Sequence, residues 1–357
     1  MRHALALGLR GIGNTGANPS VGCVIVAKDG RIVGRARTSD GGRPHAEVNA
    51  LAQAGAEARG ATAYVTLEPC AQVTATPSCA ESLVSAGVAR VVIAIQDPDK
   101  RTNGAGIAKL QGAGLEVVVG VLEKNARESH EGFLMRTSAS RPLVTLKIAQ
   151  SLDGKTATAA GDSKWITGEE ARGYGHLLRA RNDAILVGIN TALADDPELT
   201  CRVPGLEDRS PVRVVLDTRL RLGEQWKLVT TAKRTPTIVF TTAAGGGGNL
   251  RSAGVEVIQV ARDARGRPDL FALLTELSKR KITRLLVEGG ATVHAAFLDR
   301  GLADRLEIFT SPMTLGAAGH SAIDALAALT LAEAPRFHRV SQRTLGPDLL
   351  ESFVAKA

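Results

Sequence analysis

The chain has 357 residues, a length that usually divides into two domains because a single hydrophobic core seldom grows so large. Apolar residues make up 44% of it, yet no run of about 18 consecutive apolar residues occurs, so we expect a globular protein with no membrane span. The net charge of +8 is spread along the chain, which contains only 2 Trp and 7 Phe. Since nucleic-acid binders usually combine a basic stripe with aromatic platforms, we expect no nucleic-acid partner.

The N-terminus and the cysteines indicate a cytoplasmic protein. Residues 1–14 predict a short amphipathic helix and lack the small-residue cleavage site of a secretory signal. The 4 cysteines are too few for a disulfide framework, and Cys23 falls in an apolar strand while Cys201 falls in a loop. The sequence leaves the oligomeric state open, a homo-oligomer included.

The first half of the chain alternates predicted strands with predicted helices. Apolar runs predict strands at residues 21–26, 31–34, 63–67, 90–95 and 116–121. Helical patterns fall at residues 46–58, 80–86, 107–110 and 123–136. This alternation predicts a three-layer α/β/α domain on one mixed sheet. A small polar joint at 138–142 places its boundary near residue 140, giving domains 1–140 and 141–357.

The second half also predicts an α/β domain. The predicted strands are residues 143–149, 184–188, 212–217, 237–242 and 285–288. The predicted helices are residues 169–181, 269–280 and 291–299, and residues 191–197 are predicted to be a loop. Gly289-Gly290 joins a strand to a helix, where it is either a tight turn or a place where backbone and helix N-terminus approach a phosphate. The spaced G-x-G-x-x-G of dinucleotide-binding folds is absent from this junction.

His45, Cys70 and Cys79 offer one imidazole and two thiolates. Three such ligands leave the fourth tetrahedral position of Zn²⁺ open for water, and the metal brings the pKa of that water toward neutrality. Glu47 follows His45 by two residues and is placed to move protons without binding the metal. This H-x-E plus P-C…C pattern is typical of zinc-dependent base deaminases, although eight residues separate the cysteines here instead of two.

The alternative is that these cysteines are small buried residues without a metal. We favour zinc because His45 stands at a predicted helix start, Cys70 lies just past a predicted strand, and Cys79 opens a second predicted helix. Asn18, in Asn18-Pro19, is either part of a turn or a side-chain amide that holds the substrate.

Over nearly its full length the chain resembles the family of bifunctional riboflavin-biosynthesis deaminase/reductases. The matching stretches are NPSVGCVIV (18–26), PHAEVNAL (44–51), GATAYVTLEPC (60–70), AGVARVV (86–92), SLDGK (151–155), WITG (165–168), LADDPELT (193–200) and VEGGATV (287–293). The resemblance implies a cytidine-deaminase-like domain followed by a dihydrofolate-reductase-like domain. It also implies two steps on one phosphoribosyl-aminopyrimidine: a zinc-dependent deamination to a uracil, with Glu47 as the general acid–base, and an NADPH-dependent reduction of the ribosyl group to ribityl.

The resemblance also implies a set of binding residues in the second domain. The implied cofactor contacts are Ala149, Ser163, Trp165, Thr191, Asp195, Thr218, Gly290, Ala291, Thr292, Val293, His294, Ala295 and Ala296. The implied substrate contacts are Ser163, Arg179, Leu199, Arg202 and Glu288.

Several of these residues have ordinary alternatives. Arg179 and Arg202 suit a phosphate, but either could be a surface charge. Trp165 could equally be a core residue. Lys147 and Glu288 are predicted on strands, where unpaired burial would be costly, and this makes them candidates for the sugar-reducing chemistry.

The loop between the zinc cysteines departs from the family pattern. It normally contains His and Arg in the form SHHGRTPP, but here residues 71–78 read AQVTATPS, and Thr38 stands where many members have His. There are therefore two alternative hypotheses besides the two-step enzyme. One is an active reductase with a weakened deaminase; the other is a tRNA deaminase with an appended RNA-binding half.

Overall fold

The computed structural model describes residues 1–73 and 77–356. The chain divides into two compact units, Met1–Arg141 and Pro142–Ala357, next to the boundary expected near residue 140. No helix within the described ranges is both long and apolar enough to cross a membrane.

The first unit is built on a five-stranded mixed sheet with the order β2-β1-β3-β4-β5. The strands are β1 (Gly22–Val26), β2 (Ile32–Arg37), β3 (Thr62–Val65), β4 (Arg90–Ile93) and β5 (Glu116–Val119). β1 is antiparallel to β2 and β3, whereas β3, β4 and β5 are parallel. The carboxyl end of β3 therefore opens on the same edge as those of β4 and β5.

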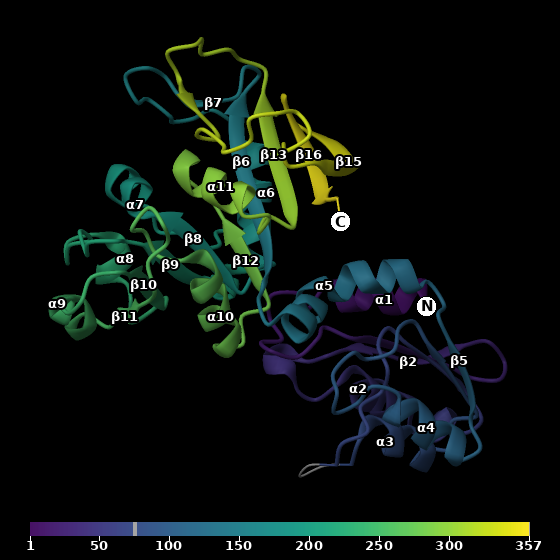
Figure 1. The fold of residues 1–357 in the computed structure, drawn as a ribbon. Helices are drawn as coiled ribbons and strands as arrows, with labels where there is room; N and C mark the ends of the chain where they lie inside the picture. The colour runs from purple at the N-terminus through teal and green to yellow at the C-terminus, as the bar shows by residue number, and fades with distance from the viewer. Residues whose placement is uncertain (74–76, 357) are drawn as a thin grey trace. The chain divides into compact units, whose positions relative to one another are not determined.

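Helices cover both faces of this sheet, as expected for a cytidine-deaminase-like α/β/α domain (Figure 1). The helices on one face are α1 (Arg2–Leu9) and α5 (Glu123–Ala139), and those on the other are α2 (Ala46–Ala54), α3 (Cys79–Ser85) and α4 (Ala105–Gly112). Short apolar side chains such as Ala50 and Ala80, both fully buried, let the helices pack closely on the sheet.

The second unit contains a nine-stranded sheet with the order β11-β10-β9-β8-β12-β6-β13-β16-β15. Its strands are β6 (Leu143–Ser151), β8 (Ala184–Gly188), β9 (Val212–Leu216), β10 (Thr237–Thr241), β11 (Glu256–Gln259), β12 (Arg284–Val287), β13 (Arg305–Ser311), β15 (Phe337–Leu345) and β16 (Asp348–Ala355). The sheet is parallel from β11 to β13, and β16 and β15 add an antiparallel edge. β7 (Lys155–Ala157) and β14 (His320–Ser321) form a separate ribbon.

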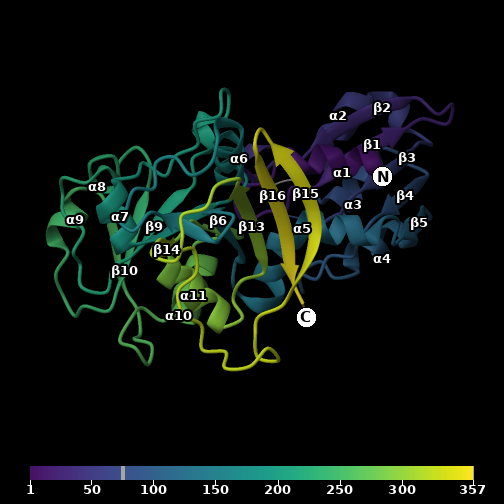
Figure 2. The same ribbon diagram turned by 90° about the horizontal axis from the view of Figure 1, so that it is seen from above.

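Two apolar clusters fill the two faces of the large sheet. One face packs against α10 (Leu270–Lys279) and α11 (Ala291–Asp299). The other packs against α6 (Glu169–Ala180), α7 (Ile189–Asp195), α8 (Lys227–Thr230) and α9 (Gly248–Ser252). Figure 2 shows α6 and the α10–α11 pair on opposite sides of the sheet. The expected α/β fold class is therefore confirmed for both halves.

Some predicted elements were wrong. Residues 191–197 were predicted to be a loop, but α7 occupies residues 189–195 and ends where Asp196 adopts a left-handed conformation before Pro197. The first long helix ends at Ala54, and residues 55–58 form a tighter 3₁₀ turn because Gly55 has positive φ. Glu288, expected on a strand, follows the end of β12.

Candidate active sites

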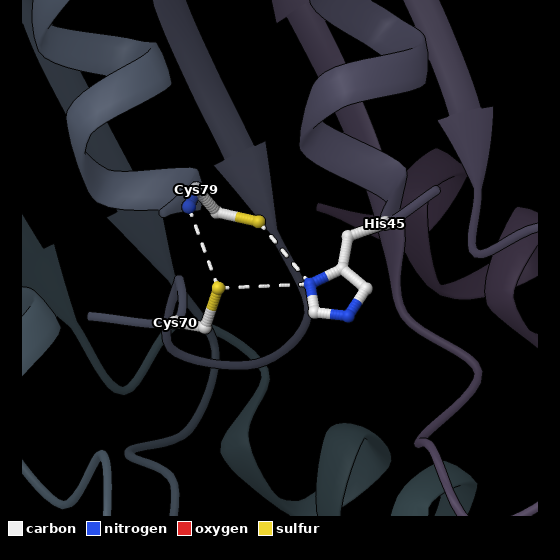
Figure 3. Close-up of side chains that lie close together, drawn as sticks. All are labelled: His45, Cys70 and Cys79. Atoms are coloured by element: carbon white, nitrogen blue, oxygen red, sulfur yellow. Dashed lines mark hydrogen bonds between the residues drawn. The ribbon is translucent and has the colours of Figure 1, made fainter. Parts of the chain in front are cut away.

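The three expected zinc ligands converge in the first unit from three elements (Figure 3). His45 is the N-cap residue of α2, and Cys79 is the first residue of α3. Ser78 fixes that helix start by a capping box with Glu81. Cys70 lies in the loop that follows β3. Two helix starts and one strand end therefore meet at a single point, as the sequence predicted.

The spacing of these atoms fits a tetrahedral metal. His45 Nδ1 lies 3.3 Å from Cys79 Sγ and 3.7 Å from Cys70 Sγ, and all three ligand atoms lie within 4.8 Å of one another. Zinc–ligand bonds of about 2.1 Å to nitrogen and about 2.3 Å to sulfur place such ligand atoms about 3.6 Å apart. One imidazole and two thiols at this spacing therefore fit a zinc ion with an open fourth position.

The two cysteines titrate differently. A hydrogen bond from the Cys79 side chain, and a weaker one from His45, lower the pKa of Cys70 to about 4. The same bond to Cys70, together with burial, raises the pKa of Cys79. Cys70 is thus ready to bind a cation as a thiolate, whereas Cys79 must lose its proton when a metal binds.

Glu47 lies in the first turn of α2 and is only 3% exposed. Burial raises the pKa of its carboxyl to about 6, against the attraction of His45. Its Oε2 is buried and has no hydrogen-bond partner among the described residues. A buried carboxylate oxygen with spare capacity next to the ligand set suits a group that hydrogen-bonds a metal-bound water.

Glu68 is a structural carboxylate that sequence reasoning did not single out. It is 3% exposed, and its two oxygens accept hydrogen bonds of 2.9–3.1 Å from the backbone N–H groups of Asp97, Gly104, Gly106 and Ile107. These bonds tie the loop before α4 and the first turn of α4 to the loop that holds Cys70. The Glu68-Pro69-Cys70 motif signals this role. A carboxylate two residues from a metal ligand is expected to be buried, and a buried carboxylate needs hydrogen-bond donors.

Asn18 lies in the loop before β1, beside the turn that leads to His45. A Cβ added to Gly42 would lie 2.2 Å from Asn18 Nδ2, so glycine is required for this close approach. Thr38 is buried and hydrogen-bonds the backbone of Pro19 and Val21, so it stabilises this loop from inside. In the altered loop 71–78, Thr74, Ala75 and Thr76 lie outside the described residues.

In the second unit, expected cofactor residues gather at the carboxyl ends of neighbouring parallel strands. Thr191 follows β8, Thr218 follows β9, Gly290 follows β12, and Ala149 lies near the end of β6. This edge is where open parallel sheets bind ligands. A Cβ on Gly290 would lie 3.2 Å from Thr191 Oγ1, so the two residues frame a narrow cradle at the start of α11. These residues fit a phosphorylated cofactor.

The other expected cofactor residues differ in exposure. Asp195 is exposed at the end of α7, and Ser163 is half-buried in the loop before α6. Trp165 is 66% exposed and stacks on the Arg172 guanidinium 4.8 Å away, so it is not a core residue. Along α11, His294 and Ala295 point into the core, whereas Ala291, Val293 and Ala296 are half-buried and Thr292 bonds Asp324.

Arg179 and Glu288 form a bidentate ion pair. Arg179 Nε and Nη2 each donate a 2.8 Å hydrogen bond to Glu288, and the side chains are only 15% and 9% exposed. Although burial opposes its charge, attraction from Arg179 and Lys147 lowers the pKa of Glu288 to about 2. Glu288 therefore binds the Arg179 guanidinium that was expected to bind a phosphate.

His176 is a further polar residue of this region that sequence reasoning missed. Its Nδ1 lies 3.1 Å from the Thr200 carbonyl, which also accepts a 3.0 Å bond from Arg179. Burial and the cations Arg179 and Arg202 lower the pKa of His176 to about 4, so its ring stays neutral. Arg202 is exposed near Glu198, and Leu199 is buried with a positive φ. A helical i, i+3 spacing of His176 and Arg179 is the signal that could have found it.

Comparison with known proteins agrees with both sites. Residues 1–95 match the family described as the cytidine and deoxycytidylate deaminase zinc-binding region, and residues 142–350 match the RibD C-terminal domain. The riboflavin biosynthesis protein RibD of Aquifex aeolicus is 41% identical, over 99% of this chain and 97% of that protein. The Escherichia coli protein of the same name is 39% identical, over 98% and 96%.

This chain belongs to the RibD family of riboflavin biosynthesis proteins. Among RibD structures, that of Acinetobacter baumannii superposes with a TM-score of 0.90 at 38% identity and covers 100% of this chain and 98% of that one. The structure of a Thermotoga maritima diaminohydroxyphosphoribosylaminopyrimidine deaminase/5-amino-6-(5-phosphoribosylamino)uracil reductase gives 0.89 at 35% identity, covering 100% and 97%.

Membership of the RibD family confirms the resemblance read from the sequence motifs. The chain is a bifunctional riboflavin-pathway enzyme, with a zinc-dependent deaminase domain and an NADPH-dependent reductase domain. The alternative of an appended RNA-binding half is wrong, because that half is the RibD C-terminal domain.

Proposed function

We propose that this chain deaminates the diaminopyrimidine ribotide after which the Thermotoga maritima enzyme is named, and then reduces the resulting uracil ribotide with NADPH. The observation that carries the proposal is the cluster of His45, Cys70 and Cys79 beside the buried carboxylate of Glu47. It stands in a chain whose second unit brings Gly290 close to the Thr191 hydroxyl at the start of α11.

In the deaminase unit, His45, Cys70 and Cys79 would bind the zinc. The ion would supply a water that ionises near neutral pH. Glu47 would take the proton of that water and pass it to the departing amine, so that water replaces ammonia on the ring carbon. Asn18 would hydrogen-bond the substrate, because its amide lies beside the turn that presents His45.

In the reductase unit, reduction of the ribosyl group breaks the bond between C1′ and the ring oxygen. NADPH would supply the hydride that adds to C1′. The ring oxygen then needs a proton, and Lys147 is our candidate donor because burial lowers the pKa of its ammonium. Glu288 would hold the opposite charge beside Lys147.

The remaining binding residues follow from their places in the fold. The cofactor would lie along the strand ends and the start of α11, in contact with Ala149, Ser163, Trp165, Thr191, Asp195, Thr218 and residues 290–296. The substrate would contact Ser163, the backbone of Leu199, Arg202 and Glu288, and Arg202 would bind its phosphate because its guanidinium is exposed. We place the enzyme in the cytoplasm, since all 4 cysteines are free thiols.

A weakened deaminase stays a second candidate because the His and Arg of the usual ligand loop are missing from residues 71–78. The metal ligands and Glu47 are in place, so the alteration concerns substrate affinity. In that case zinc content would be normal while the KM for the diaminopyrimidine ribotide would be far above that of a RibD with the usual loop.

The reductase half can be tested alone. Residues 142–357 have their own apolar clusters on both sheet faces and form one compact unit, so we expect this fragment to fold independently. It should oxidise NADPH when given 5-amino-6-(5-phosphoribosylamino)uracil. A fragment that is folded by circular dichroism but inactive with that substrate would refute the reductase assignment, and preference for NADH would refute only the cofactor.

A further inference from the structure

Lys147 lies in the middle of β6, and its side chain reaches helix α6. A Cβ added to Gly175 of that helix would lie 4.0 Å from Lys147 Cε, so the helix passes directly over the lysine stem. Within the described part of the chain, the Lys147 ammonium has no hydrogen bond and no ion pair. A long flexible side chain with a charged tip and no fixed partner needs something else to hold it in one place.

The ammonium instead lies over an aromatic ring. Lys147 Nζ is 5.6 Å from the centroid of Phe309, a distance at which the negative face of a ring attracts a cation. β6 and β13 are parallel neighbours, with Lys147 opposite Glu307 and Ala149 opposite Phe309. Paired residues of neighbouring strands share one face of the sheet, and the small Ala149 leaves the ring free to reach diagonally to Lys147.

The ring of Phe309 is itself fixed. It is only 1% exposed and belongs to the apolar cluster under α6. Tyr174 packs against it at 6.2 Å with the planes tilted by 57°, and the Arg343 guanidinium lies over Tyr174 at 5.8 Å. Phe309 therefore offers a fixed surface for the long side chain of Lys147.

We propose that Phe309 is a positioning residue of the reductase, which holds the Lys147 ammonium in one direction and stabilises its charged form. This rests on the proposed role of Lys147 in the reduction. The charged or titratable groups around Lys147 are Glu288 after β12, Arg179 on α6, Glu307 on β13 and His294 on α11. Phe309 differs from all of these because it favours the ammonium without competing for its protons.

The test uses the full-length enzyme with Phe309→Leu, Phe309→Met and Phe309→Tyr. The Leu and Met variants remove the ring face, so kcat for reduction should fall about 10-fold with little change in the KM for NADPH. The alkaline limb of the kcat–pH profile should also move to lower pH by about half to one unit, since the ammonium has lost stabilisation. Phe309→Tyr keeps the aromatic ring face, so it should restore both kcat and the pH profile to the wild-type values.

Phe240→Leu is the matched control, because Phe240 is a fully buried phenylalanine of the same unit in the cluster on the opposite face. It should lower thermal stability without moving the pH profile, and circular dichroism together with NADPH binding in each preparation reports that the second unit is folded. Unchanged kcat and pH profile in folded Phe309→Leu or Phe309→Met would overturn the inference, as would failure of Phe309→Tyr to restore them. Wild-type reduction by Lys147→Met would instead refute the role of Lys147.

Discussion

Both carboxylate oxygens of Glu288 accept hydrogen bonds of 2.8 Å from the guanidinium of Arg179, which lies 109 residues earlier in the chain. The pair connects helix α6 to the end of strand β12, next to the glycine cradle expected to bind the cofactor. Because both side chains are nearly buried, the pair both supports the fold and sets the charge of the reductase site.

Glu288→Gln should destabilise the second unit by about 3 kcal/mol at neutral pH, since it leaves the Arg179 cation buried without its counter-charge. The folded pKa of Glu288 is about 2, below the usual unfolded value of about 4.3. Its stabilisation is therefore complete above about pH 4.3 and is lost as the pH falls through 2. Urea unfolding of wild type and variant from pH 2 to 7 would show their difference shrinking in this window.

Glu256→Gln is a suitable control, because Glu256 pairs with Arg280 at the surface and its side chain is 50% exposed. Exposed pairs contribute about 0–1 kcal/mol, so this variant should change little at any pH. Equal effects of the two substitutions would show that burial of the Arg179–Glu288 pair is unimportant.

Cys79→Ala should abolish zinc binding and deamination but leave reduction nearly intact, because Cys79 belongs to the first unit only. Metal analysis should find about one zinc per wild-type chain and almost none in the variant. Cys23→Ala, which removes an equally buried thiol on β1, should keep its zinc. Freshly purified wild type without zinc would contradict the metal assignment.

Glu47→Gln keeps the size of the side chain but removes its ability to accept and return a proton. We expect full zinc content and deamination slower by about two to four orders of magnitude. Glu81→Gln, which alters the α3 capping box and the ion pair with Lys109, should have a far smaller effect on turnover. Near wild-type deamination by Glu47→Gln would mean that another group moves the proton.

Gly290→Val should raise the Kd for NADPH at least about 10-fold, because its branched side chain would enter the cradle beside Thr191. Its φ of −76° is open to any residue, so the backbone should tolerate the change. Gly173→Val is the control, since a Cβ there meets nothing within 4 Å. Fluorescence titration with NADPH measures the Kd of both variants. Equal Kd values for Gly290→Val and Gly173→Val would mean that the cofactor binds elsewhere.

The sequence predicted the metal cluster well because its residues sit in short local motifs at helix starts and a strand end. The same holds for β8 and β10, whose residues are all buried. β15 gave no comparable signal: it is an edge strand whose residues are mostly exposed, and it pairs with β16. Its pattern is therefore not apolar.

Contacts between distant segments could not be predicted from motifs. The engagement of Arg179 by Glu288, and the ring of Phe309 beneath Lys147, both depend on strand order, which brings β6 between β12 and β13. Helix α7 was missed because Asp195-Asp196-Pro197 indicates a loop, whereas the preceding residues bury Ile189 and Ala192 against the sheet. Tertiary packing decided these elements.

The most direct test of the two-step assignment is to incubate the full-length protein with the diaminopyrimidine ribotide, with and without NADPH, and to identify the products by mass. Without NADPH we expect the uracil ribotide and ammonia. With NADPH we expect that uracil to gain two hydrogens and become the ribityl compound. An unchanged ribotide in both reactions, from protein that contains zinc and is folded, would contradict the account.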